Sequence, residues 1–168
     1  MEIEKKYLIR ELPELDGVQK KVIEQGYLCR GPILRIRKSN NNYILTYKSR
    51  QGLEQKNAIQ NEEVELPLTE EAYNHLKQKV DGYIVEKTRY ILPLPSGRKA
   101  ELDVFSGRLC GLVFVEVEFD SEEQAIQFVL PAWFGEEVST EEFFSNAYLS
   151  TVENYDDWVY QRSIAEKI

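Results

Sequence analysis

Charged residues occupy alternate positions near the start of the chain, where Glu2, Glu4 and Lys6 lie within residues 1–8. In a β-strand successive side chains point to opposite faces, so these three would share one face. Buried charges without partners are costly, which makes this face unsuited to an ordinary apolar core. Hard divalent cations prefer carboxylate oxygens as ligands, and an ammonium attracts phosphate oxygens. The stretch therefore indicates a site for a metal ion and a phosphate chain.

Six further segments repeat this alternation, mostly as pairs of like charge separated by one residue. The basic positions are Lys6, Arg35, Arg37, Lys48, Lys87 and Arg89. The acidic positions are Glu2, Glu4, Glu63, Glu65, Glu101, Asp103, Glu116 and Glu118. The six bases and eight acids come close to mutual compensation, and the residues between them are mostly Ile, Leu, Val and Tyr.

These charges are the groups that phosphoryl transfer uses. Arginine offers a planar fork that matches two phosphate oxygens, whereas lysine acts as a point charge. The carboxylates at positions 2, 4, 116 and 118 would repel one another unless a hard cation lay among them, and Mg²⁺ or Mn²⁺ favours oxygen ligands. Bases and carboxylate-bound metal suit phosphoryl transfer because its catalysis is chiefly positioning and charge neutralisation.

Strands must position most of these residues. Strands are predicted at 2–8, 33–38, 43–50, 60–66, 83–92, 99–105 and 111–119, with a turn of Ser and Asn at 39–42. Helices are predicted at 16–25, after a Thr69 cap, from Ser121 to about Leu130, and through an aromatic-rich tail. No linker or internal repeat interrupts the pattern, so residues 1–168 are expected to form a single domain.

Two arrangements of the strands satisfy the alternation. In the usual one, an antiparallel sheet exposes its charged face to water and buries its apolar face. In the other, the charges line the lumen of a closed barrel and helices cover the apolar outer face. The pairing of like charges, the near compensation of bases and acids, and the amphipathic helices favour the second. We therefore expect an α+β fold with a charged lumen.

Composition excludes several classes of protein. The net charge of −8 argues against general nucleic-acid binding, which depends on a positive field. No apolar run approaches the roughly 20 residues that cross a bilayer, so no membrane partner is expected. Cys29 and Cys110 have no CxxC spacing, which is typical of reduced thiols and favours a cytoplasmic location. The aromatic-rich tail would serve either a homodimer interface or the outer coat of the barrel.

The ordered motifs resemble those of a known family. Glu2-x-Glu4-x-Lys6 is similar to the ExExK signature of the CYTH superfamily, the triphosphate tunnel metalloenzymes. It is followed in order by Leu34-Arg35-Ile36-Arg37, Thr46-Tyr47-Lys48, Glu63-Val64-Glu65, Lys87-Thr88-Arg89-Tyr90, Glu101-Leu102-Asp103-Val104-Phe105, and Gly111-Leu112 running into Glu116-Val117-Glu118. The resemblance implies an eight-stranded antiparallel closed β-barrel with helices packed on its outside.

The resemblance also implies a role for each charged position. Glu2 and Glu4, with Glu116 and Glu118, would hold the metal ion, and Glu101 and Asp103 would serve a second cation or orient the attacking water. Arg35, Arg37, Lys48, Lys87 and Arg89 would bind the triphosphate, and Lys6 would stabilise the developing charge. Glu63 and Glu65 would be either ligands or partners of neighbouring bases. Phe143 and Phe144 replace a basic residue and a tyrosine of relatives, and are expected to pack near one mouth of the tunnel.

The leading function is metal-dependent hydrolysis of a linear triphosphate, most simply inorganic triphosphate to pyrophosphate and phosphate, with Mg²⁺ or Mn²⁺ as cofactor. A class IV adenylate cyclase and a thiamine triphosphatase would use the same lumen, with an adenine pocket or an aromatic platform in addition. A non-catalytic polyphosphate or nucleotide-binding module would keep the bases and could dispense with several carboxylates. The presence of all eight acidic positions favours an enzyme.

Overall fold

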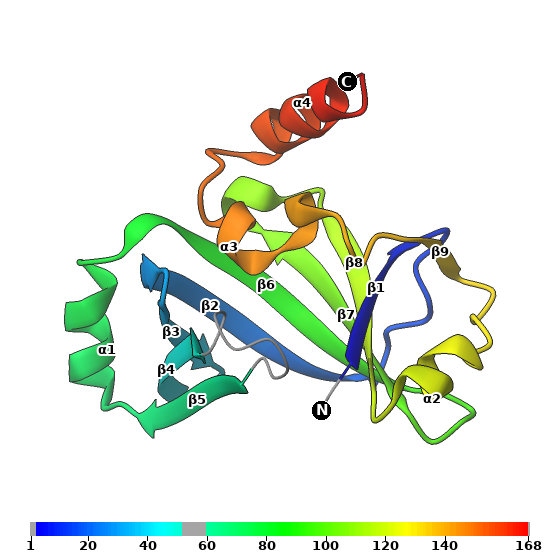
Figure 1. Ribbon diagram of the computed structural model, residues 1–168, viewed down its shortest axis with the longest axis horizontal. Helices are drawn as coiled ribbons and strands as arrows, with labels where there is room; N and C mark the ends of the chain where they lie inside the picture. Colours follow the sequence, from blue (N-terminus) through cyan, green and yellow to red (C-terminus); the bar gives the residue numbers. More distant parts are fainter. Residues whose placement is uncertain (1–2, 52–59, 168) are drawn as a thin grey trace.

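The computed structural model describes residues 3–51 and 60–167, and in these ranges nine strands form one antiparallel sheet (Figure 1). The strands are β1 Ile3–Ile9, β2 Gln19–Arg30, β3 Ile33–Ser39, β4 Asn42–Gln51, β5 Gln60–Pro67, β6 Asp81–Pro93, β7 Lys99–Ser106, β8 Val113–Phe119 and β9 Phe134–Glu137. Their order across the sheet is β5-β4-β3-β2-β6-β7-β8-β1-β9. Strand β1 thus pairs with the late strands β8 and β9.

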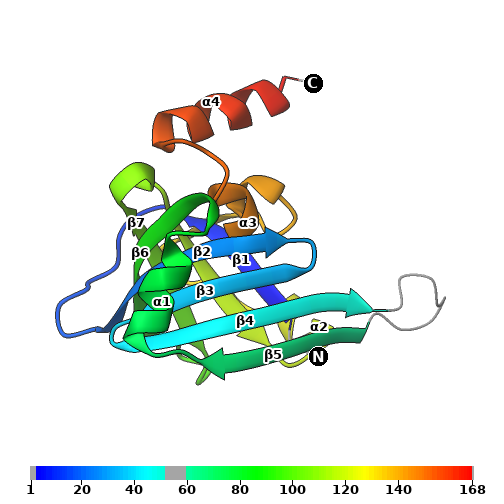
Figure 2. The same ribbon diagram turned by 90° about the vertical axis from the view of Figure 1, so that its left-hand side faces the viewer.

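The α+β class is confirmed, but the predicted eight-stranded closed barrel is not. The sheet curls strongly (Figure 2), yet within the described residues β5 and β9 are its two edges and no hydrogen bonds join them. Two strands are missing from the prediction: β2, whose segment was predicted as a helix, and β9, whose four residues pair with β1 across a register shift. Short strands of this kind carry little sequence signal, because four residues are too few to show a clear alternation of apolar and polar side chains.

The helices are short and lie on the outside or at one end of the sheet. They are α1 Glu70–Lys77, α2 Glu122–Ile126, α3 Asn146–Leu149 and α4 Tyr155–Ala165, with 3-10 turns at Gly107–Leu109 and Glu142–Phe144. None of the helices in residues 3–51 and 60–167 combines the length and the apolar character needed to span a membrane.

Two hydrophobic clusters hold these elements together. The first lies on the apolar face of β1, β7 and β8, where Tyr7, Leu102 and Val117 meet Ala125 of α2 and Phe134 of β9. The second brings β-strand residues of the opposite face against the C-terminal segments; it contains Val85, Phe105, Phe114, Leu109, Leu112, Val138, Phe144, Leu149, Val152 and Trp158. The expectation that Phe144 packs is confirmed, since its side chain is fully buried.

The predicted helix at 16–25 is wrong, because most of that segment belongs to β2. Val18, Val22 and Ile23 fit a helical spacing, but Ile23, Gln25 and Tyr27 alternate and are all buried. Pairing with both β3 and β6 decides in favour of the strand. β-branched residues such as Val22 and Ile23 also prefer strands.

The tail prediction is partly wrong as well, since β9 lies inside the segment expected to be helical. The helix that begins after Ser121 ends at Ile126, earlier than Leu130. The predicted cap of α1 is confirmed, because the hydroxyl of Thr69 accepts a hydrogen bond from the amide of Ala72 at 3.1 Å.

The Thr69 cap gives a stability prediction. Thr69→Ala should lower the free energy of unfolding by about 1 kcal/mol, since it leaves an amide in the first turn of α1 without its partner. Urea denaturation would measure this, with Thr69→Ser as the control that keeps the hydroxyl. Equal stability of the Ala variant and the wild type would show that the cap contributes nothing.

Candidate active site

Strand register brings the predicted charges onto one face of the sheet, which we call the charged face. Residues directly opposite in neighbouring strands share a face. Glu4 lies opposite Glu118, Lys6 opposite Glu116, and Arg89 opposite Asp103. The described members of the charged face are Glu4, Lys6, Arg35, Arg37, Lys48, Glu63, Glu65, Lys87, Arg89, Glu101, Asp103, Glu116 and Glu118. Glu2 lies outside the described residues.

The middle of the charged face is enclosed. Lys87 is 1% exposed, Asp103 0% and Glu116 6%, which is rare for charged side chains unless they are paired. The ordinary explanation of alternating charges, a face open to water, is therefore wrong for Lys87, Asp103 and Glu116, although Glu118 of β8 is exposed. The charges at the other end of the sheet are more open, because Lys48, Glu63 and Glu65 are exposed.

Asp103 is the centre of the buried charges. Its Oδ2 accepts hydrogen bonds from Lys87 Nζ at 2.8 Å and from an Arg89 terminal nitrogen at 2.9 Å, and its Oδ1 accepts one from Arg89 Nε at 2.8 Å. The fork of Arg89 thus grips both oxygens, which is the strong geometry for this pair. Arg89 also reaches Glu101 at 2.5 Å and Glu116 at 3.5 Å.

The electrostatics of this cluster follow from burial and pairing. Burial by itself would raise the pKa of Asp103, but the charges and hydrogen bonds of Lys87 and Arg89 outweigh it and hold that pKa below its ordinary value. Burial lowers the pKa of Lys87, against the attraction of Asp103. Burial would also lower the pKa of Arg89, but its hydrogen bonds to Asp103 raise it further than burial lowers it.

Lys6 lies where the charged face meets the C-terminal segments. Its ammonium donates a hydrogen bond to the main-chain oxygen of Phe144 at 3.0 Å. Glu4 and Glu116 lie at 3.8 Å and 3.7 Å from the same nitrogen, and the ring of Phe114 lies 5.5 Å away. The ammonium is therefore held in place by a carbonyl while it faces two carboxylates.

Strands β2 and β3 supply a second basic region. Gln25 Oε1 accepts hydrogen bonds from Arg37 Nε at 2.9 Å and from an Arg37 terminal nitrogen at 2.8 Å. Burial, and then the charges of Arg35 and Arg89, lower the pKa of Arg37 to about 10. Two donors here, Arg35 Nε and Gln25 Nε2, are buried without a hydrogen-bond partner. Buried donors without partners are rare. An anion at this place would accept hydrogen bonds from both donors and offset the repulsion between the Arg35, Arg37 and Arg89 guanidinium groups.

Carboxylates crowd the opposite end of the charged face, on β1 and β8. Burial raises the pKa of Glu4, and the charges of Glu116 and Glu118 raise it further, against the effect of Lys6. The oxygen donors of these three residues fit a hard divalent cation. Within the ranges 3–51 and 60–167, however, no three acidic, His or Cys side chains already stand in an arrangement that would hold a metal ion.

Comparison with known proteins places this geometry in a family. No protein-family model matches the chain. An inorganic triphosphatase of Nitrosomonas europaea is 40% identical over 154 residues, which cover 89% of this chain and 96% of that protein. The chain belongs to this inorganic triphosphatase family, within the CYTH superfamily.

Solved structures agree with this CYTH assignment. A crystal structure of an inorganic triphosphatase superposes with a TM-score of 0.73 at 36% identity, covering 92% of this chain and 97% of the other. A Hippeastrum protein described as an adenylyl cyclase candidate with dominant triphosphatase activity has a TM-score of 0.51 at 17% identity, covering 75% of this chain and 83% of its own. At that identity the second likeness supports the fold alone.

In this CYTH protein the contacts of Asp103 differ from those predicted. Asp103 was expected to bind a second cation or orient water, but both its oxygens accept hydrogen bonds from Lys87 and Arg89 and its side chain is 0% exposed. Its contacts are those of a residue that holds two bases in place. Glu101 is only partly buried and forms an ion pair with Arg89.

Reasoning from the sequence assigned no role at the site to four participants. Gln25 and Lys21 lie on the charged face of β2, since Gln25 is opposite Arg37 and Lys21 opposite Arg89. The alternation Lys21-x-Ile23-x-Gln25 was the available signal, hidden by the helix prediction. Asn146 lies 3.5 Å from Lys87 Nζ, and the Phe144 main-chain oxygen binds Lys6. A backbone carbonyl has no sequence signature.

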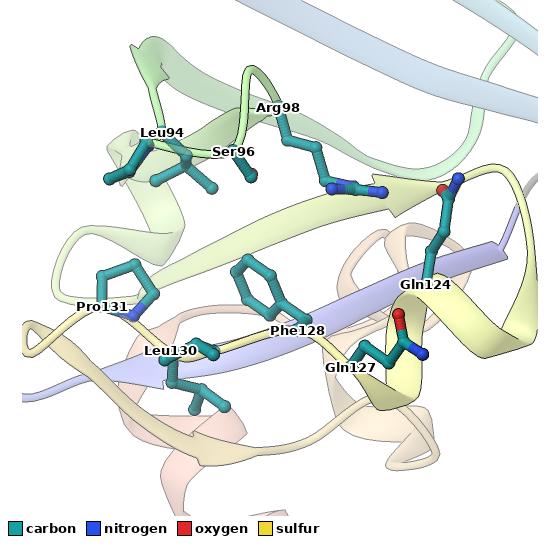
Figure 3. Close-up of a pocket in the computed structure, with 10 residues that line it drawn as sticks. Leu94, Ser96, Arg98, Gln124, Gln127, Phe128, Leu130 and Pro131 are labelled. Atoms are coloured by element: carbon teal, nitrogen blue, oxygen red, sulfur yellow. The ribbon is translucent and has the colours of Figure 1, made fainter.

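A separate cavity of about 450 Å³ lies outside the charged face (Figure 3). It lies between the turn at 94–98 and the segment from Gln124 of α2 to Pro131, and Figure 3 shows Arg98 reaching from that turn toward Gln124. Its walls are mostly apolar and contain none of the predicted site residues. This cavity is therefore separate from the predicted site of this CYTH protein.

The Asp103 cluster gives a prediction about stability. Asp103→Asn should lower the free energy of unfolding by about 3–5 kcal/mol at pH 7, because it leaves the ammonium of Lys87 buried without a counter-charge. A carboxyl with a lowered folded-state pKa stabilises the fold above its unfolded pKa and loses this effect as the pH falls through the folded pKa. The difference between wild type and variant should therefore shrink in strong acid.

Denaturant unfolding at several pH values would test this prediction. Asp16→Asn makes the same chemical change at an exposed position and should leave stability nearly unchanged. A penalty for Asp103→Asn that matches this control would show that the buried pair contributes no net stability.

Proposed function

We propose that this protein hydrolyses a linear triphosphate, most simply inorganic triphosphate to pyrophosphate and phosphate, with Mg²⁺ or Mn²⁺ as cofactor. The observation that carries the proposal is the burial of Lys87, Asp103 and Glu116 on a face of the sheet that also carries further bases and clustered carboxylates. The relatives that share this fold and sequence include an inorganic triphosphatase, which supports the same reaction for this chain.

The bases on β3 and β6 would bind the phosphate chain. Arg35 Nε and Gln25 Nε2 are buried donors without partners, so phosphate oxygens would supply what they lack. Arg37 and Arg89 would add positive charge from either side, and Asp103 holds the guanidinium of Arg89 in place through Nε and one terminal nitrogen. Lys48 would meet the substrate at the more open end of the charged face.

The acidic residues on β1 and β8 would hold the cation. Glu4, Glu116 and Glu118 provide the donor oxygens, with Glu2 as the further ligand proposed from the ExExK motif. The raised pKa of Glu4 reflects burial and then repulsion from Glu116 and Glu118, and a cation would relieve that repulsion. When bound, such a cation neutralises phosphate charge and lowers the pKa of water.

The protein's own groups would carry the rest of the reaction. Water attacks the terminal phosphorus and gives up a proton to solvent, the bond from that phosphorus to the bridging oxygen breaks, and pyrophosphate leaves with the bridging oxygen. Negative charge develops on that oxygen, and the ammonium of Lys6 would stabilise this charge. The Phe144 carbonyl and Glu116 hold that ammonium on the charged face. Asp103 keeps Lys87 and Arg89 aligned throughout.

A substrate panel tests the proposed reaction. Inorganic triphosphate, ATP, thiamine triphosphate and pyrophosphate would each be incubated with Mg²⁺ or Mn²⁺, and phosphate release measured. We expect rapid, metal-dependent release from inorganic triphosphate and little from the others. Cyclic AMP from ATP would identify a cyclase instead, and preferred cleavage of thiamine triphosphate would identify that hydrolase. Tight triphosphate binding without turnover would identify a binding module.

The proposed cation ligands make a second prediction. Glu4→Gln should reduce metal-dependent turnover by about 10²-fold or more, because a cation supplies several kcal/mol of charge stabilisation that needs an anionic ligand. Glu137→Gln is the matched control: it makes the same change on the opposite face, where Glu137 pairs with Lys5 at 3.1 Å. Turnover by Glu4→Gln at the level of this control would remove Glu4 from the cation site.

A further inference from the structure

The ammonium of Lys6 depends for its position on a segment far along the chain. Its hydrogen bond to the Phe144 oxygen joins residues 138 positions apart. Phe144 is fully buried, and its ring packs edge-on against Phe114 with centroids 5.6 Å apart. The same Phe114 ring lies under Lys6. The carbonyl that holds Lys6 therefore belongs to a turn packed tightly against the charged face.

Helix α4 fixes this turn from the other side. The indole N–H of Trp158 donates a hydrogen bond to the main-chain oxygen of Phe143 at 2.8 Å. The Trp158 ring also packs edge-on against Phe144, with centroids 5.3 Å apart. The Phe143 carbonyl is thus bound by α4, and the next carbonyl along the chain, that of Phe144, is bound by Lys6.

A second contact joins α4 to the same turn. Arg162, one helical turn after Trp158, pairs with Glu141 at 3.2 Å and lies 5.1 Å from the centroid of the Phe144 ring. The segment leading into α4 is held as well, because Arg108 donates hydrogen bonds to the main-chain oxygens of Ile84, at 2.8 Å, and Val152. Figure 1 shows α4 above α3 at this end of the sheet.

The backbone hydrogen bonds of the turn at Glu142–Phe144 bind the carbonyls of Glu141 and Glu142, whereas the carbonyls of Phe143 and Phe144 accept hydrogen bonds from the side chains of Trp158 and Lys6. We propose that Trp158 is a positioning residue for catalysis: through the Phe143 carbonyl it sets the orientation of the Phe144 carbonyl, and thereby the place of the Lys6 ammonium. This inference rests on the proposed triphosphatase function, in which Lys6 stabilises the leaving oxygen.

Trp158→Phe removes the indole N–H and keeps an aromatic ring against Phe144. We expect kcat for inorganic triphosphate to fall about three- to tenfold, the size of effect that one hydrogen bond supplies, with KM nearly unchanged. Tyr160→Phe on the exposed side of the same helix is the control and should keep full activity. Arg162→Gln, which releases Glu141 but leaves Trp158 in place, should lower kcat in the same direction.

A double-mutant cycle separates positioning from general loosening of the fold. If Trp158 acts through Lys6, Trp158→Phe should have no further effect on the residual turnover of Lys6→Met. An equal fractional loss of kcat in both backgrounds would overturn the proposal. A loss confined to KM would overturn it as well.

A chemical measurement tests the same inference without turnover. Acetylation by an amine-reactive reagent, quantified by peptide mass spectrometry, should be severalfold faster at Lys6 in Trp158→Phe than in wild type. Lys5, which is on the opposite face, and the fully buried Lys87 should be unchanged. Equal labelling of Lys6 in both proteins would overturn the proposal even if the wild type hydrolysed triphosphate. Faster labelling in a protein without triphosphatase activity would support the positioning and reject the proposed function.

Discussion

The burial of one carboxylate among two bases governs the arrangement of the charged face. Asp103 has no exposed surface, so its charge is tolerable only because Lys87 and Arg89 both bind it. This fixes the side chains of Lys87, Arg89 and Asp103. The one terminal nitrogen of Arg89 that Asp103 does not bind pairs with Glu101, and the terminal nitrogen that it does bind also lies 3.5 Å from Glu116. The partly neutralised cluster of Asp103, Lys87 and Arg89 allows the bases and acids of the charged face to lie close together.

The two hydrophobic clusters explain how a sheet can enclose charge. One covers the apolar face of β1, β7 and β8, as in any sheet packed on one side. The other lies on the charged side and closes one end of it, where Phe105 and Phe114 meet Phe144 and Leu149. The polar region is therefore bounded by apolar groups rather than open at both ends, which strengthens every interaction between its charges.

The sequence predicted the faces of the strands better than the contacts within them. Alternation placed Lys87, Arg89 and Asp103 on one face, because the two-residue period of a strand does not depend on its neighbours. Whether Asp103 would meet a metal ion or two bases depended on the register that sets it opposite Arg89, which a sequence does not state. Gln25 was missed because the apolar residues of its segment fit both a helical and a strand spacing. Only the pairing with β3 and β6 decides in favour of the strand.

The position of β1 has a consequence for how the protein is made. This first strand pairs with β8 and β9, so its neighbours are synthesised only after most of the chain. Closing so long a loop costs entropy that local contacts cannot offset early, which delays this pairing in folding. Glu4 and Lys6 can therefore meet their partners on β8 and at Phe144 only after residues 113–144 have been synthesised. The nascent protein can form the hairpins of its middle strands long before β1 and β8 bring their charged residues together. The complete charged face, and with it the activity, therefore forms late in synthesis.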